Sequence, residues 1–357
     1  MQIKRTILFI VVLVILSVGF IGINKNQSIA KRVPFIVPKG WPQPVYDFSK
    51  NPLSEEGIAL GKQLFYDTQL SKDGTISCGS CHQQFGAFNS YDHPLSHGLE
   101  NALTTRNAPA LFNLAWQKEF MWDGGINHLD LQPLAPITAH NEMGEDIANV
   151  LAKLKKIKQY PKLFKAAFGD ETINTQRLGK ALSQFLLTMV SSNSKYDQVM
   201  RGEDSFLLPE KLGHAIFKTK CAQCHAEPLF TDYSYRNIGI TLEPYLNDIG
   251  RMTITNDASD SLKFKVPSLR NVVVSFPYGH DGRFFSLMNV FEHYRNHMQI
   301  GPTTDAVLKN KLPLSNYEIG QLRAFLQTLT DSVFLKDPRF AEPGMGAHSN
   351  PPLDQHN

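Results

Sequence analysis

Two stretches of the same form, Cys78-Gly-Ser-Cys81-His82 and Cys221-Ala-Gln-Cys224-His225, decide how this chain folds. In each stretch two thiols stand three residues apart on one helical turn, and a histidine follows directly. Thiols at this spacing can add to the two vinyl groups of a porphyrin, and the histidine then lies under the iron as its proximal ligand. The sequence therefore predicts two covalently bound haems of the c type.

Two other uses of the four cysteines compete with this interpretation. They could form two disulfides, or the two pairs together could form one four-thiolate zinc site. Both alternatives leave the histidine after each pair unexplained. Because the two motifs use every cysteine of the chain, covalent haem is the favoured prediction.

The length and charge of the chain limit its architecture and its partners. Its 357 residues are enough for two compact domains with a leader and a tail. The formal net charge is +3, from 36 basic and 33 acidic residues, without a block of like charges that would follow a phosphate backbone. We therefore expect no nucleic-acid partner.

The N-terminus carries the pattern of an exported protein. Lys4 and Arg5 precede an apolar run from Ile7 to Ile23, which fits residues 1–25 as either a cleaved signal peptide or a retained membrane anchor. A lipoprotein is excluded because no cysteine lies near this leader. We expect a periplasmic protein, soluble or anchored by an uncleaved leader.

The rest of the chain divides into two similar units. Each unit has Gly-x-x-x-Phe on a predicted helix before its Cys-x-x-Cys-His motif, with Gly61 and Phe65 in the first and Gly213 and Phe217 in the second. Each also ends in an amphipathic helix with one apolar face. The apolar positions are Leu178, Ala181, Leu182, Phe185 and Met189 in the first, and Ile319, Leu322, Phe325, Leu326 and Leu329 in the second.

This pattern predicts a mainly α fold of two cytochrome c-like haem domains with long loops and little β. Ser315 and Glu318 have the spacing of a capping box that starts the last helix. Short apolar runs at 264–266 and 272–276 weakly indicate strands. The expected segments are an extended Pro-rich lead-in at 26–50, an N-terminal domain at 51–205, a C-terminal domain at 206–335 and a flexible tail at 336–357.

Further motifs follow one another in a fixed order from residue 41 to residue 331. The motifs are Leu64-Phe-Tyr-Asp67, Leu70 to Thr75, Arg106-Asn-Ala-Pro109, Trp122-Asp-Gly124, Glu142-Met-Gly144, Val266-Pro-Ser-Leu-Arg-Asn271 and Tyr278-Gly-His280-Asp-Gly282. In these motifs the chain resembles the bacterial dihaem cytochrome c peroxidase family, which includes the MauG-type enzymes.

The resemblance implies different roles for the two haems. The haem on His82 would bind peroxide in the N-terminal domain, and the haem on His225 would handle electrons, with Trp122 between them. Glu142 would act as the acid/base group that moves a proton between the peroxide oxygens, and Gln132 would position the peroxide. The alternatives are that Trp122 is a core aromatic and that Glu142 caps the helix expected to begin near Asp146.

The resemblance also suggests further metal ligands. His97 resembles a displaceable distal ligand of the first haem iron, with His93 as a competitor in the same loop. Tyr294, as in MauG-type enzymes, or Met298 one turn later, as in the peroxidases proper, would be the sixth ligand of the second iron. A calcium ion between the domains would be held by Asn107, Ser275 and Pro277.

The activity that the resemblance implies is reduction of hydrogen peroxide to water. Electrons would come from a small donor such as a monohaem cytochrome c or a cupredoxin. The alternatives are MauG-like oxidation of protein side chains and a non-enzymatic dihaem electron carrier. A homodimer and anchoring to the membrane by the N-terminus are both compatible with this activity.

Overall fold

The structure, a computed structural model, describes residues 30–344 and is built mainly of helices. Within this part of the chain the sheet structure is one antiparallel pair, β1 (Tyr235–Arg236) and β2 (Phe264–Lys265). The prediction of a mainly α fold is confirmed. No helix among these residues is both long and apolar enough to span a lipid bilayer, and the leader lies outside the described residues.

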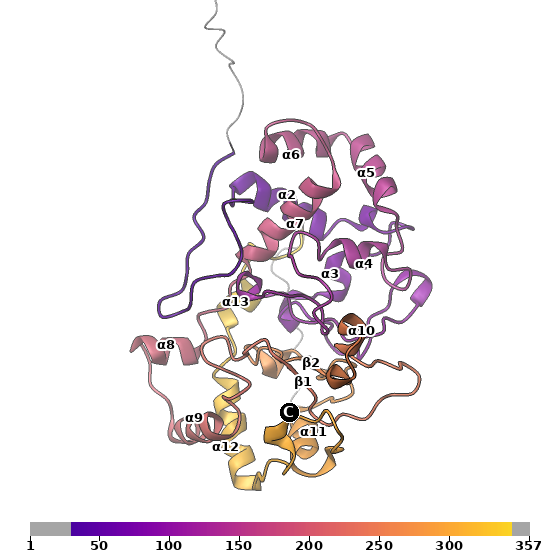
Figure 1. The fold of residues 1–357 in the computed structure, drawn as a ribbon. Helices are drawn as coiled ribbons and strands as arrows, with labels where there is room; N and C mark the ends of the chain where they lie inside the picture. The colour runs from indigo at the N-terminus through magenta and orange to yellow at the C-terminus, as the bar shows by residue number, and fades with distance from the viewer. Residues whose placement is uncertain (1–29, 345–357) are drawn as a thin grey trace, which may run out of the picture.

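The helices form an upper and a lower group in Figure 1, and α13 returns from the lower to the upper group. The upper group is α2 (Glu55–Phe65), α3 (Cys78–Cys81), α4 (Leu134–Thr138), α5 (Ile147–Lys156), α6 (Gln159–Phe168) and α7 (Thr175–Thr188). The others are α8 (Lys195–Arg201), α9 (Leu208–Lys220), α10 (Met252–Thr255), α11 (Leu287–Glu292), α12 (Asn316–Gln327) and α13 (Ser332–Lys336).

Each group is held together by a close helix crossing at the glycine that the sequence singled out. A Cβ atom on Gly61 of α2 would lie 2.0 Å from the carbonyl oxygen of Ala181 in α7, and one on Gly213 of α9 would lie 2.0 Å from that of Gln321 in α12. Only glycine therefore permits these backbones to approach so closely. The predicted apolar faces of α7 and α12 are buried at these crossings.

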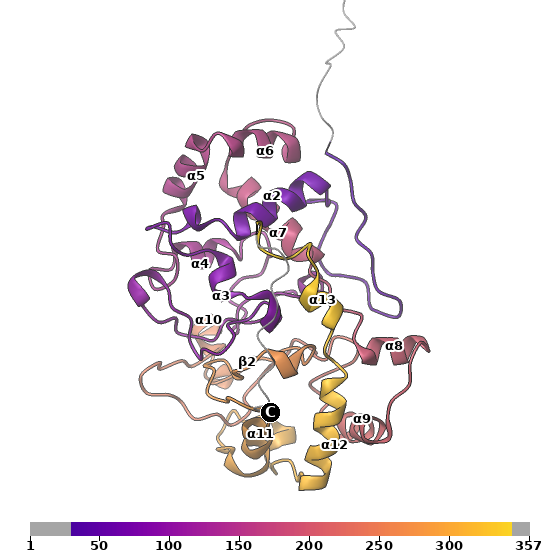
Figure 2. The same ribbon diagram turned by 180° about the vertical axis from the view of Figure 1, so that it is seen from behind.

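The two groups have separate buried cores. The cores do not follow the chain order at every point, because Phe334 and Phe340 near the C-terminus pack in the first core and Tyr196 of α8 packs in the second. Seen from behind in Figure 2, α13 continues upward from α12 to reach that first core. The last described segment of the chain therefore packs against the N-terminal half.

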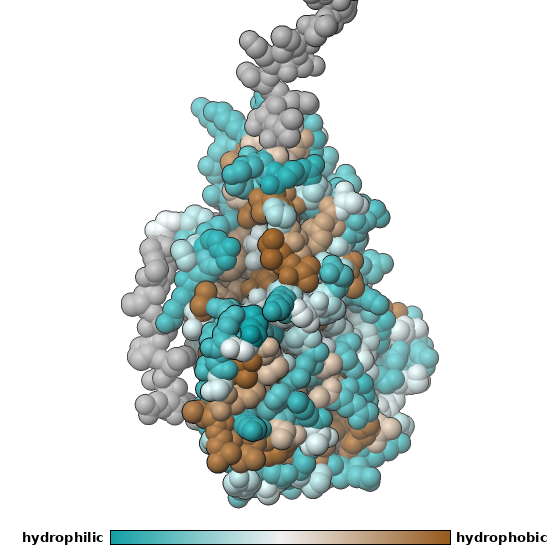
Figure 3. Space-filling model, turned by 90° about the vertical axis from the view of Figure 1, so that its left-hand side faces the viewer, coloured by the Kyte–Doolittle hydropathy of each residue, from teal (hydrophilic) through white to brown (hydrophobic). Residues whose placement is uncertain are grey.

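The lead-in before α2, described from residue 30, contains no helix and packs on the first core. Phe35 stacks on Phe48 with ring centroids 4.6 Å apart, and Trp41 meets Trp116 edge-on at 4.9 Å. The Trp41 ring also contacts the guanidinium of Arg270 from the second group, whose Cζ lies over the ring 4.5 Å from its centroid. The side of the molecule in Figure 3 shows polar side chains with apolar ones gathered in separate patches.

One of the two strand predictions is wrong. Phe264 and Lys265 form β2, but Val272–Val274 is a turn of 3₁₀ helix that follows Asn271 in the left-handed region, at φ 56°. In a strand, Val272 and Val274 would share one face. In the turn they separate, and Val272 packs in the second core while Val274 packs in the first.

The capping box at the start of α12 is confirmed. The Glu318 amide donates to Ser315 Oγ at 3.2 Å, and the Ser315 amide donates to Glu318 Oε2 at 2.9 Å. This pair satisfies two of the amide groups that a helix start leaves without partners. The helix that carries the apolar face of the second core therefore begins where the sequence predicted.

The importance of glycine at the helix crossings can be tested by comparison with Gly320, which has open space where a side chain would be. Gly213→Ala should destabilise the protein by about 1–3 kcal/mol, because the new methyl group forces α9 away from α12. Gly320→Ala, in the interior of α12 with no atom within 4 Å of the new Cβ, should stabilise it by up to about 1 kcal/mol. The free energy of unfolding in urea measures both. Equal changes in the free energy of unfolding for the two variants would contradict the close crossing.

Candidate haem-binding site

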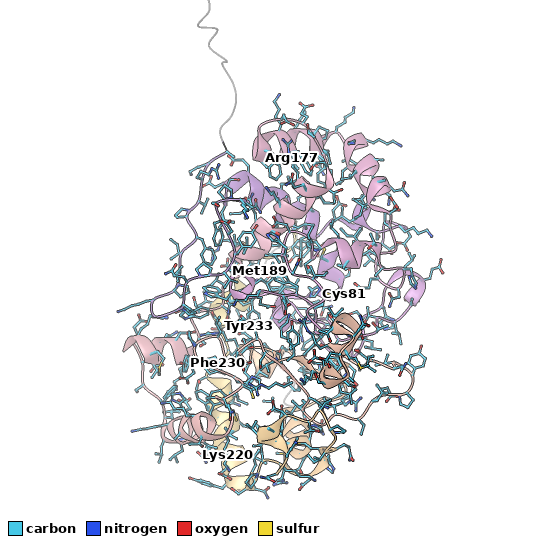
Figure 4. All side chains as sticks on the ribbon, viewed as in Figure 1. Cys81, Arg177, Met189, Lys220, Phe230 and Tyr233 are labelled. Carbon is cyan, nitrogen blue, oxygen red and sulfur yellow. The ribbon has the colours of Figure 1, made fainter. Side chains whose placement is uncertain are left out.

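A cavity of about 670 Å³ connects the two halves of the molecule and is lined by residues of both Cys-x-x-Cys-His motifs. Its walls include Cys81 and His82 from the first motif and Cys221, Cys224 and His225 from the second. Three of its lining residues are labelled in Figure 4, where Cys81 lies in the upper half, Lys220 in the lower half and Tyr233 between them. The structure thus brings the two predicted haem motifs to one space.

The first motif presents its histidine in the form that binds iron. His82 follows α3 directly, and its Nδ1 lies 2.7 Å from the carbonyl oxygen of Phe88. A carbonyl can only accept, so Nδ1 carries the proton and Nε2 is left with its lone pair. Burial lowers the pKa of His82 to about 4, which keeps the ring neutral at ordinary pH.

The second motif repeats this arrangement at the end of α9. Nδ1 of His225 lies 3.1 Å from the carbonyl oxygen of Phe230 and 3.2 Å from that of Pro267. Burial also lowers the pKa of His225. A ligand imidazole whose other nitrogen donates to a backbone carbonyl has a fixed ring orientation and a higher basicity at the iron. Both histidines therefore fit the role of proximal ligand.

The cysteines also fit covalent haem better than the competing interpretations. All four are free thiols, and burial raises the pKa of Cys78 and of Cys221 to about 12. Within residues 30–344, no three of the histidine, cysteine, aspartate and glutamate side chains are grouped to hold a metal ion. The two pairs thus do not form one zinc site, and the thiols, neutral imidazoles and largely apolar walls fit two porphyrins.

Trp122 joins the two halves at the cavity wall. Its indole Nε1 donates to the carbonyl oxygen of Asn107 at 2.8 Å, and its own carbonyl accepts from the amide of Lys265 in β2, also at 2.8 Å. The first bond fixes the ring to the upper half and the second fixes the backbone to the lower half. Trp122 lines the cavity that both motifs share, and its role between the two motifs stays a prediction.

An ion cluster beside Trp122 was missed by the sequence analysis. The guanidinium of Arg106 binds Asp248 through Nε at 2.6 Å and Nη2 at 2.8 Å, and its Nη1 binds Asp123 at 2.5 Å. Arg106 precedes the acceptor Asn107, and Asp123 follows Trp122. Arg106 stands in a motif quoted from the sequence, but no local pattern indicates a partner 142 residues away.

Glu142 and Gln132 both line the cavity. The carboxyl group of Glu142 has no hydrogen bond or ion pair with another described residue, and burial raises its pKa. The alternative that Glu142 caps α5 is wrong, because Asp146 is the cap and its Oδ1 accepts from the Ala148 amide at 2.7 Å. Gln132 Nε2 lies 3.8 Å from Met121 Sδ, so its amide keeps most of its hydrogen-bonding capacity.

The distal-ligand candidates are placed very differently. His97 and its competitor His93 are both exposed, with ring centroids 5.5 Å apart, and neither lines the cavity. Tyr294 lines the cavity, and burial raises the pKa of its phenol. Met298 is 3% exposed and does not line it. His293–His297 is a π-helical turn, whose wider period takes Met298 off the face that Tyr294 occupies.

The three residues expected at a calcium ion, Asn107, Ser275 and Pro277, line the same cavity. Nδ2 of Asn107 donates to the carbonyl oxygen of Pro94 at 3.0 Å, which leaves its Oδ1 as the atom that could bind a cation. The carbonyl oxygen of Ser275 accepts from Asn89 at 2.7 Å. The structure brings the candidates together, and calcium binding stays a prediction.

Comparison with known proteins agrees with this geometry. Residues 55–205 match the family model of the di-haem cytochrome c peroxidases. The chain is 33% identical to the methylamine utilization protein MauG of Methylophilus methylotrophus, over 85% of this chain and 90% of that protein. It is 32% identical to cytochrome c551 peroxidase of Nitrosomonas europaea, over 78% of this chain and 81% of that protein.

A solved structure shows the same fold. A MauG-like protein associated with microbial copper homeostasis superposes with a TM-score of 0.76 and 32% identity, covering 87% of this chain and 99% of that one. The chain therefore belongs to the di-haem cytochrome c peroxidase and MauG family, a family of oxidoreductases. Membership confirms the predicted resemblance and removes support for the non-enzymatic electron carrier.

The ion cluster beside Trp122 makes a prediction about stability. Arg106→Leu should cost on the order of 3 kcal/mol, because it leaves the carboxylates of Asp123 and Asp248, 10% and 9% exposed, without their cation. As a control, Glu203→Gln breaks a more exposed pair with Arg201 and should cost clearly less, because water screens an exposed ion pair. Urea unfolding measures both, and similar losses would refute a structural role for the cluster.

Proposed function

We propose that this protein reduces hydrogen peroxide to water with electrons from a small redox protein such as a monohaem cytochrome c or a cupredoxin. The observation that carries the proposal is the half-buried Glu142 carboxyl group, which lies in the wall of the cavity lined by Cys81 and His82 and has no hydrogen bond or ion pair within residues 30–344. Haem bound at the motifs would supply the iron that takes up peroxide and exchanges electrons.

The reaction needs protons at the substrate as well as electrons. Each peroxide takes up two protons and two electrons and gives two water molecules. Because burial raises the pKa of Glu142, its carboxyl group can hold a proton at Oε and release it to the departing oxygen. The amide of Gln132 lines the same cavity and would orient the peroxide by hydrogen bonding.

Electrons from the donor would enter at the second motif and cross to the first. Trp122 lines the shared cavity and is hydrogen-bonded to both halves, so its indole is held in a defined position between the two sites. We also propose two cytochrome c-like domains at 51–205 and 206–335, a calcium ion at Asn107, Ser275 and Pro277, and a periplasmic location. The two separate cores support the domains.

Removing the proton carrier tests the proposal. Glu142→Gln keeps the shape of the side chain but cannot exchange a proton, so peroxide turnover should fall about 10²–10⁴-fold while both haems stay bound. Steady-state peroxide consumption and the pyridine haemochrome spectrum measure the two properties.

Glu145→Gln is the matched control. Glu145 is more deeply buried than Glu142, but it binds Lys153 at 2.5 Å and does not line the cavity, so turnover should remain close to that of the unmodified protein. Undiminished turnover in the Glu142 variant, or an equal loss in both variants, would refute the role of Glu142.

Tyr294 favours a second candidate function, MauG-like oxidation of protein side chains. Its phenol lines the cavity beside the second motif, whereas the thioether of Met298 does not. If this function holds, peroxide alone should convert the protein to a long-lived oxidised form that a protein substrate discharges and a small donor does not. Optical spectra after stoichiometric peroxide decide this, since rapid discharge by cytochrome c supports the first proposal.

A further inference from the structure

The carbonyl group that His82 binds is presented by a strained loop. Residues Ala87 and Phe88 both lie in the left-handed region at φ 60°, although neither is glycine. Such conformations persist only where the surrounding structure holds them. Inside the loop, the Phe88 amide donates to the carbonyl oxygen of Gln83 at 2.8 Å, and the Phe88 side chain is fully buried. The position of the Phe88 carbonyl therefore depends on what anchors the loop.

Asn89, the next residue, hydrogen-bonds this loop to the turn at 272–275, which comes from the second half of the chain and reaches both cores through Val272 and Val274. Its Nδ2 donates to the carbonyl oxygen of Ser275 at 2.7 Å, across 186 positions of the chain. Asn89 is 3% exposed, and its Oδ1 is buried without a hydrogen-bond partner. Burying an unsatisfied acceptor is unfavourable, so the amide is held there by the bond that its nitrogen makes.

The second motif has the same construction with one difference. Phe230 is also left-handed, at φ 56°, and its carbonyl oxygen accepts from His225. The following residue, Thr231, donates through Oγ1 to the carbonyl oxygen of Val266 at 2.6 Å. Val266 belongs to the same half as His225, so this hydrogen bond is local, although Leu229 beside it packs in the first core. Of these two loops, only the one at His82 has its following side chain hydrogen-bonded to a segment of the other half.

We propose that Asn89 is a positioning residue for the first haem. Through Asn89, the position of the second half relative to the first sets the strength of the His82–Phe88 hydrogen bond. Asn89 and Phe88 are adjacent, so a shift of Ser275 moves the peptide group that faces His82. A stronger hydrogen bond at Nδ1 makes the imidazole a stronger donor to iron, which lowers the reduction potential of that iron. The inference rests on the proposed haem attachment at Cys78 and Cys81.

Asn89→Leu, compared with Thr231→Val in the full-length protein with both haems, tests this proposal. Each substitution keeps the branched shape of the side chain and removes its polar atoms: the amide of Asn89, whose Oδ1 has no partner, and the hydroxyl of Thr231, which also accepts from the Tyr233 amide at 2.9 Å. The Asn89 variant should shift the iron–histidine stretching band of the first reduced haem to lower frequency and its midpoint potential to a more positive value. The second haem should stay unchanged. The Thr231 variant should shift the same two properties of the second haem and leave those of the first haem unchanged. Resonance Raman spectra and a redox titration measure both properties.

The proposal is overturned if the Asn89 variant leaves both properties of the first haem unchanged, or shifts the two haems alike, as general loosening would. It is also overturned if the Thr231 variant shifts the first haem as strongly. Loss of haem from unmodified protein would instead refute the attachment itself, and absence of peroxide turnover would refute the proposed reaction. Neither result resembles a selective shift of one haem.

Discussion

The hydrogen bond from a buried imidazole to a backbone carbonyl is the constraint on which the two candidate sites depend. His82 reaches Phe88 and His225 reaches Phe230, each from Nδ1. Burial makes the neutral ring the stable form, and the bond fixes which nitrogen is left for iron. The glycine crossings serve the same end, because they hold α9, which leads into the second motif, and α2, whose Phe65 packs near Phe88, in place.

Polar contacts around Trp122 hold the two halves together, so that the two similar motifs line one cavity. Trp122 is bound to Asn107 above and to Lys265 below, and the cluster of Arg106 with Asp123 and Asp248 closes the joint beside it. These contacts are polar and directional, so they specify a geometry as well as an attraction. An internal duplication alone would supply two haem pockets, and this joint gives them a shared wall.

The two halves are alike at the Cys-x-x-Cys-His motifs and differ at the cavity residues proposed to take part in the chemistry. Both keep thiols, histidine and a left-handed phenylalanine. Beyond these, the cavity wall offers the unpartnered carboxyl group of Glu142 on one side and the phenol of Tyr294 on the other. A carboxyl group with a raised pKa can carry protons, whereas a phenol is a candidate iron ligand. The two similar sites are therefore suited to different roles.

The sequence by itself determined the Cys-x-x-Cys-His motifs, the Gly-x-x-x-Phe pattern before each of them and the cap of α12, because each is a pattern within one or two helical turns. The helix that each glycine meets lies more than 100 residues away and was decided by packing. Tertiary structure alone decided the conformation of 272–276, where two valines pack in different cores. It also decided that Tyr294 lines the cavity and Met298 does not, at a π-helical turn. It also decided the partners of Arg106 and Asn89, which lie 142 and 186 residues away. Such bonds form only once packing has brought distant segments together, so no local spacing can predict them.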